Sequence, residues 1–209
     1  SRISVGPAIS FYKNMPHYTT NIKAKIGINA TYKAEIFLLP RTNLLVGLEY
    51  MNQGFTFHGY YKAPGFTYLF DETYAYTHEI RYSEIQLPIA FKLSLAQERD
   101  FPITPYIFGG INLRYIINSY YLISSDSTGT TEYDGKGNLD FENQLLKGLN
   151  ANFQAGIGIQ KNRRTKAKAL FAELTFKKGI SRLHYTGYNN SNNVAIRESN
   201  VAITFGFRF

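Results

Sequence analysis

Four histidines are the residues of this chain best suited to acid–base or metal chemistry, and each falls in or beside a segment expected to be a loop. They are His17, His58, His78 and His184, and five acids share these loops: Asp71, Glu72, Asp126, Glu132 and Asp134. An imidazole beside a carboxylate can serve as a general base, and the same groups bind zinc. The sequence holds neither an HExxH motif nor a nucleophile elbow. We therefore expect no catalytic, metal or cofactor site, with a His/Asp hydrolytic site as the less favoured alternative.

Charged residues also recur at alternate positions of eight segments. If those positions line the interior of a barrel, they place four acids and five bases in one narrow space: Lys33, Glu35, Glu49, Glu84, Lys92, Arg114, Glu173, Lys177 and Arg208. Burying unpaired charge is costly, so we expect a paired network. A glycosidase-like carboxylate pair would need substrate access, which a filled lumen denies. A gated ion or proton path is the alternative to a structural network.

The elements that position these residues alternate apolar and polar side chains with a period of two, which is typical of strands with two different faces. The clearest case is Thr20–Leu38, where isoleucines and alanines alternate with lysine, asparagine and threonine. Eight segments share the pattern: Arg2–Phe11, Thr20–Leu38, Asn43–Gln53, Thr77–Leu95, Ile103–Tyr121, Leu149–Gln160, Lys168–Ser181 and Asn200–Phe209. They predict one all-β domain over residues 1–209, an eight-stranded antiparallel up-and-down barrel closed on itself.

The connections alternate in length, which is typical of outer-membrane barrels. Three are short: Pro40–Thr42, Ala96–Pro102 and Lys161–Ala167. Four are longer: Tyr12–Thr19, His58–Tyr76, Leu122–Gly148 and Leu183–Glu198. This asymmetry predicts that both termini and the short turns are periplasmic and that the long loops lie outside the cell. The last of these loops, with its run of asparagines, is expected to be plain turn structure.

A soluble ligand-binding barrel would show the same alternation with apolar side chains inward, so three further features decide between the two. The polar face of Leu149–Gln160 is small and uncharged, tyrosine and phenylalanine total 33 and gather near strand ends, and the chain closes on alternating phenylalanines. Those are Phe205, Phe207 and Phe209, which resemble the C-terminal assembly signal of outer-membrane barrels. Together they favour a transmembrane barrel whose apolar face meets lipid.

Composition excludes other classes. No apolar run reaches the ~18 residues of a membrane helix. The net charge is +8, but the basic residues are scattered rather than gathered in one patch, which argues against nucleic-acid binding. The chain has no cysteine and so cannot form disulfides.

Several segments resemble the PorT-like family of outer-membrane β-barrels, in family order: Leu48–Phe55, Tyr82–Lys92, Pro105–Tyr115, Asn152–Ile159 and Val201–Phe209. The resemblance implies an eight-stranded barrel of the Bacteroidetes type. The family's namesake is tied to protein secretion across the outer membrane, and the resemblance brings no catalytic residues with it.

The segment between the third and fourth strands is rich in aromatic residues: Tyr60, Tyr61, Phe66, Tyr68, Phe70, Tyr74 and Tyr76. Such patches often mark interfaces, although some of these residues could simply extend the strands. The sequence thus predicts a non-catalytic barrel that is a structural or accessory subunit of a larger envelope complex, for protein secretion or outer-membrane protein assembly, in contact with lipid and lipopolysaccharide. A free-standing structural or adhesion-type barrel is the alternative.

Overall fold

The computed structural model describes residues 1–13, 19–62, 73–96, 102–125, 149–161, 169–180, 183–186 and 193–209. Nine strands form in chain order: β1 (Arg2–Lys13), β2 (Thr19–Leu39), β3 (Thr42–Lys62), β4 (Thr73–Ser94), β5 (Ile103–Ser125), β6 (Leu149–Lys161), β7 (Ala169–Gly179), β8 (Leu183–Thr186) and β9 (Asn193–Arg208). Within these residues, no helix is present that could cross a membrane.

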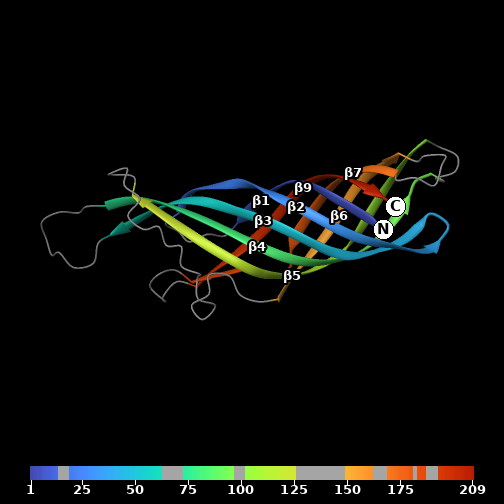
Figure 1. Cartoon of the computed structure of the whole chain (residues 1–209). Coiled ribbons are helices and arrows are strands. Elements are labelled where there is room, and N and C mark those ends of the chain that lie inside the picture. The colour runs from blue at the N-terminus through green and yellow to red at the C-terminus, as the bar shows by residue number, and fades with distance from the viewer. Residues whose placement is uncertain are drawn as a thin grey trace, which may run out of the picture.

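Eight of the strands close into one antiparallel up-and-down barrel, which confirms the predicted fold. Each strand from β1 to β7 pairs with the next, β7 pairs with β9, and β9 returns to β1. The two chain ends meet at one end of the barrel, where the Ser1 amino group lies 2.8 Å from the carbonyl oxygen of Phe209 (Figure 1). Closure leaves no unpaired edge around the body of the barrel.

The strand boundaries differ from the predicted ones at the other end. β3 runs to Lys62 and β4 begins at Thr73, so much of the predicted loop His58–Tyr76 is paired strand. The predicted loop Leu183–Glu198 likewise contains paired strand, because β8 pairs with the first residues of β9 as a hairpin. Most of the asparagine run, for which plain turn structure was predicted, lies outside the described residues. In both cases the chain continues a strand pairing past the point where apolar and polar residues cease to alternate.

The two faces of the sheet have opposite character. The outward side chains form a band of exposed apolar residues, the apolar belt, with Ile26 74% and Phe205 61% exposed. The inward side chains are mainly polar or charged and are buried, among them Asn112 and Gln86 at 0% exposure. Apolar residues therefore face outward, as a lipid environment requires and as a soluble ligand-binding barrel does not show.

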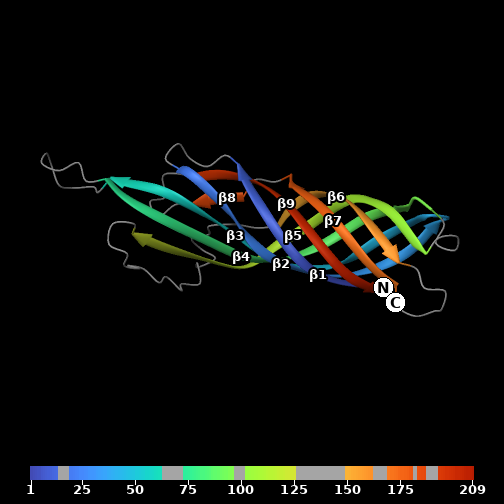
Figure 2. The ribbon, with the colours of Figure 1, turned by 90° about the horizontal axis from the view of Figure 1, so that it is seen from above.

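The barrel is much taller on one side. β2, β3, β4 and β5 have 21, 21, 22 and 23 residues, whereas β1, β6 and β7 have 12, 13 and 11. We call these four long strands the tall wall; it projects at the end away from the chain termini (Figures 1 and 2). At ~3.3 Å per residue, a strand of this length spans about 70 Å, far more than a tilted crossing of a ~25 Å apolar band.

Candidate functional site

The lumen holds a layered network of buried ion pairs, and Glu173 on β7 is the centre of the layer nearest the chain termini. Arg2 Nη1 lies 2.7 Å from Glu173 Oε1, and Lys33 Nζ lies 3.3 Å from Oε2. The Tyr106 hydroxyl donates to Oε1 at 2.9 Å and accepts from Arg2 Nη2 at 2.6 Å. The Arg2 guanidinium also lies 3.9 Å from the centre of the Phe171 ring. Each charge of this layer is therefore paired and surrounded by aromatic side chains.

Glu35 on β2 organises a second group at the same end. Its Oε1 accepts hydrogen bonds from Lys92 Nζ at 2.7 Å and from Asn43 Nδ2 at 2.7 Å. Arg208 Nε lies 3.1 Å from Oε2 in an ion pair. Lys92 also donates to Gln160 Oε1 at 3.2 Å. Strands that do not pair with each other, such as β2 with β9 and β4 with β6, are thereby linked through the interior.

Glu49 and Lys177 form a close ion pair in the middle of the lumen, between β3 and β7. Asn29 Nδ2 donates to Glu49 at 2.6 Å, and Lys177 Nζ donates to Gln86 Oε1 at 2.8 Å. Gln86 accepts a further hydrogen bond from Asn112 Nδ2 at 3.1 Å. The amides fill the hydrogen-bonding capacity that the two charges leave open.

Arg114 on β5 lies between two carboxylates nearer the tall end. Its Nη1 is 2.5 Å from Glu198 Oε2 and 3.4 Å from Glu84 Oε2. Gln53 Nε2 donates to Glu84 Oε1 at 3.0 Å, and Asn200 also donates to Glu198. This layer ties β3, β4, β5 and β9 together across the lumen.

Aromatic and aliphatic side chains follow beyond the last ion pairs. The hydroxyls of Tyr12 and Tyr82 lie 3.1 Å apart, and the rings of Tyr12 and Phe55 are 4.3 Å apart. Ile80 and Ile116 are buried beside them. Across the described residues the lumen is thus filled by side chains, which suits an eight-stranded barrel and denies access to a substrate.

The structure places all nine charged residues expected in the lumen on its inner face, and each lies in at least one ion pair. Seven are buried, and Glu35 and Arg208 are half-buried near the barrel end. Two members of the network were missed. Arg2 alternates with apolar residues in the first strand, so the signal was present, whereas Glu198 was assigned to a loop that proved to be strand.

The other predicted residues lie elsewhere or outside the described residues. Phe205, Phe207 and Phe209 point outward and are exposed. Of the aromatic segment, Tyr60, Tyr61, Tyr74 and Tyr76 lie on paired backbone of β3 and β4, whereas Phe66, Tyr68 and Phe70 lie outside the described residues.

The histidine side chains and the five loop acids are also outside the described residues. Among the side chains that are described, no group of three or more His, Asp or Glu could hold a metal ion.

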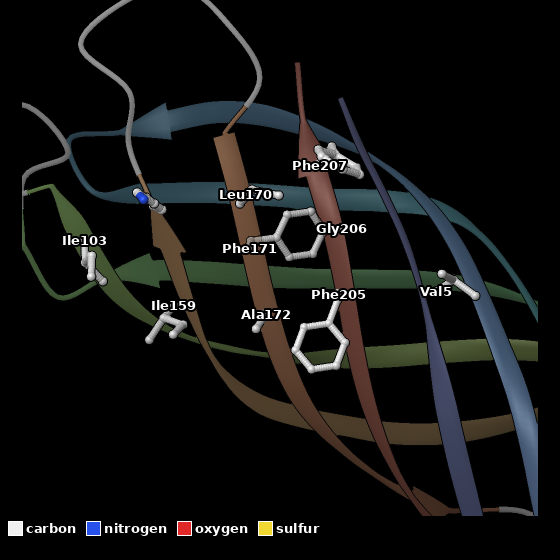
Figure 3. A pocket seen from close by; sticks show the side chains of 10 residues that line it. Val5, Ile103, Ile159, Leu170, Phe171, Ala172, Phe205, Gly206 and Phe207 are labelled. Carbon is white, nitrogen blue, oxygen red and sulfur yellow. The ribbon is translucent and has the colours of Figure 1, made fainter.

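A shallow hollow on the outer surface is apolar in character. It has a volume of about 520 Å³ and lies over β6, β7 and β9 (Figure 3). Its lining includes Ile103, Ile159, Leu170 and Phe205, with Lys161 as a charged member. Because this hollow faces the lipid side of the barrel, its surface suits a hydrocarbon chain rather than a polar substrate.

Comparisons with solved structures return outer-membrane barrels at low identity. Neisserial surface protein A is 12% identical with a TM-score of 0.48, the match covering 100% of this chain and 96% of that one. Ail of Yersinia pestis, in complex with the heparin analogue sucrose octasulfate, is 13% identical with a TM-score of 0.41 and coverages of 100% and 97%. OprG of Pseudomonas aeruginosa is 11% identical with a TM-score of 0.43 and coverages of 100% and 94%. None of the curated proteins matches the chain.

The family assignment comes from a family model, described as the outer membrane protein beta-barrel domain, that matches residues 2–185. This range covers most of the chain and includes β1 to β7. It agrees with the closed antiparallel barrel and its outward apolar belt. The chain therefore belongs to the family of the outer membrane protein beta-barrel domain, and it is an integral protein of the bacterial outer membrane.

Proposed function

We propose that this barrel is a non-catalytic structural or accessory subunit of an envelope complex, serving protein secretion or outer-membrane protein assembly. The filled lumen is the observation that supports this most. Ion pairs such as Arg2–Glu173 and Arg114–Glu198 occupy the interior, and Tyr12 and Tyr82 lie beyond them. A barrel without an open passage acts through its outer surfaces. The resemblance to PorT-like barrels favours secretion among the envelope processes.

The tall wall is the surface best placed to meet a partner. In the proposed orientation both termini are periplasmic, so the wall extends beyond the outer leaflet. At its tip Tyr60 pairs with Ala75 and Tyr61 pairs with Tyr74 across β3 and β4. Tyrosine is enriched at protein interfaces, and a backbone that is already paired loses little entropy on binding. The partner is a larger outer-membrane protein.

Three alternatives use the same fold. A free-standing structural or adhesion-type barrel would display the tall wall without a stable partner. An outer-membrane enzyme would use the loop histidines and acids, and alanine at all four histidines would abolish its activity. An ion path through the lumen would give a stable open channel in a planar bilayer, whereas the proposed barrel gives none.

Co-purification in mild detergent tests the proposal. The protein with an N-terminal tag is expected to elute with a stoichiometric outer-membrane partner. Serine at Tyr60, Tyr61, Tyr74 and Tyr76 together is expected to release that partner while the barrel stays folded. Tyr32→Ser is the matched control, because Tyr32 is an exposed tyrosine whose hydroxyl lies 3.2 Å from Ser1 Oγ, near the chain termini. Elution of the unaltered protein as a monomer without a partner would contradict the proposal.

A further inference from the structure

A cluster of basic side chains lies on the outer face of the tall wall. Lys25 on β2 pairs with Gly54 on β3, and Gly54 pairs with Arg81 on β4, so the two cations share one row across three strands. Glu79 lies beside them, in a close ion pair with Lys25 and 2.7 Å from Arg81 Nε. Lys23 is exposed two residues further along β2. It pairs with Thr56 on β3, and Thr56 pairs with Glu79 on β4. Two cations therefore contact the carboxylate of Glu79, and a third lies two strands away from it on the same face.

A β-bulge turns Lys25 to the outside. The inward residues of β2 are Lys33, Thr31, Asn29 and Gly27, and regular alternation would continue this face with Lys25. The β2–β3 pairing instead shifts register between Lys25 and Ile28, which reverses the faces of the residues that follow toward the tall end. An inward lysine at this level would have to be buried near the tyrosines at the top of the lumen. The bulge places its charge on the outer wall.

Gly54 leaves room between the two cations. A Cβ at this position would lie 2.9 Å from Arg81 Cγ, which shows that the Arg81 side chain passes over the glycine. Lys25 is 26% and Arg81 is 44% exposed at the side chain, so both can still meet a ligand. Lys25 and Arg81 thus offer donors from two strands on the outer surface, on either side of Gly54.

The cluster lies just beyond the apolar belt. Passing outward along the wall, the row of Tyr50 and Ile85 is followed by the polar row of Asn52 and Ser83, and then by Lys25 and Arg81. On β2 the change is immediate, because Ile26, next to Lys25, is 74% exposed. This is the level at which a bilayer changes from hydrocarbon to headgroups. Lysine and arginine side chains are the usual partners of phosphate.

We propose that Lys25 and Arg81, assisted by Lys23, bind a phosphate of lipid A in the outer leaflet. Among the described side chains, the three cations outnumber the one carboxylate of Glu79, which gives this set a net positive charge. The apolar belt below, beginning at Ile26, contacts the acyl chains of the same molecule. The assignment to the outer leaflet rests on the proposed orientation of the barrel. The phosphate site itself rests on the positions of Lys25 and Arg81 just beyond the apolar belt.

Binding to the purified full-length protein in detergent micelles tests the inference. Phosphorylated lipid A is expected to bind about tenfold more tightly than its dephosphorylated form. The double variant K25Q/R81Q is expected to lose that preference. The variant E79Q is expected to bind phosphorylated lipid A severalfold more tightly, because it removes the competing carboxylate. A purely structural ion pair predicts no gain for this variant.

The control variant is K178Q. Lys178 is also an exposed, outward lysine, but its neighbours across the strands are Phe153 and Ser199. It should leave the preference unchanged. Equal binding of the two lipid forms by the unaltered protein would overturn the inference, and so would displacement of lipid A by millimolar inorganic phosphate, which would indicate a site for free phosphate. Micelles have no inner or outer leaflet, so failure here leaves the proposed orientation and function standing.

Discussion

Glu173 shows how a single buried carboxylate holds several strands together. It contacts Arg2, Lys33 and Tyr106, which come from β1, β2 and β5, at 2.7, 3.3 and 2.9 Å. Removing one partner of a buried ion pair leaves an uncompensated charge, and this costs more than the pair itself contributes. Replacing one charged residue of the lumen therefore lowers the free energy of unfolding mainly because its partner stays buried without a counter-charge.

Glu173→Ala is expected to lower the free energy of unfolding by about 3–5 kcal/mol, because Arg2 and Lys33 would stay buried without their partner. Glu79→Ala is the comparison, since Glu79 lies in ion pairs on the outer wall and exposed pairs contribute about 1 kcal/mol or less. Urea unfolding in lipid vesicles measures both. Equal losses for the two variants would show that the lumen network has no special role in stability.

Gly158 supports the ring of Tyr106. A Cβ at this glycine would lie 2.3 Å from Tyr106 Cζ, whereas a Cβ at Gly109 would have only an ordinary contact at 3.7 Å. Gly158→Ala is expected to cost about 1–3 kcal/mol through overpacking. Gly109→Ala is expected to change the urea midpoint little. Unaltered stability of the first variant would mean that Tyr106 can move away without breaking its contacts to Arg2 and Glu173.

At the scale of the strands, alternation of side chains predicted most of the fold. It assigned the lipid and lumen faces of the barrel strands, apart from the part of β2 that precedes the bulge after Lys25, and it placed residues such as Lys92 and Arg114 inside. The short turn after β2 is present as Pro40 and Arg41, with Arg41 at a φ of 75°. These features depend on neighbours in sequence, which is why the residues alone reveal them.

Other features depend on pairing between distant segments and could not be predicted. The bulge near Lys25 is a one-residue shift against β3, and the strand beginning at Asn193 is specified by β1, β7 and β8 together. The same holds for the lumen. Which lysine meets which glutamate follows from the stagger of strands around the closed barrel, as in Lys177 and Glu49, 128 positions apart.

The outward face of β4 offers a test at this scale. Leu87 points outward within the apolar belt and is 42% exposed. Leu87→Arg is expected to lower the free energy of unfolding in vesicles by about 2–4 kcal/mol, because a charge would face the hydrocarbon. Asn52→Arg, on the polar row beyond the belt, is expected to cost about 0–1 kcal/mol. The reverse order of the two variants would place the membrane at a different height on the barrel.

The molecule as a whole combines a lipid-facing exterior, a filled interior and a wall that rises on one side only. Closure through β1 and β9 brings the two chain ends together and leaves the long ends of β2 to β5 at the opposite side of the membrane (Figure 2). In the proposed function, the filled lumen argues against transport, and the tall wall is the surface assigned to lipid headgroups and to a partner. All of these features depend on one arrangement, in which apolar side chains face outward to lipid and polar side chains face the lumen.

Thiol labelling measures that arrangement most directly, because the natural chain has no cysteine. Phe91 and Ala90 are adjacent on β4, with exposures of 58% and 2%. In vesicles, Phe91→Cys is expected to react with a membrane-soluble maleimide, whereas Ala90→Cys is expected to react only after unfolding in urea. Protection of the first thiol together with rapid labelling of the second in the folded barrel would contradict the account.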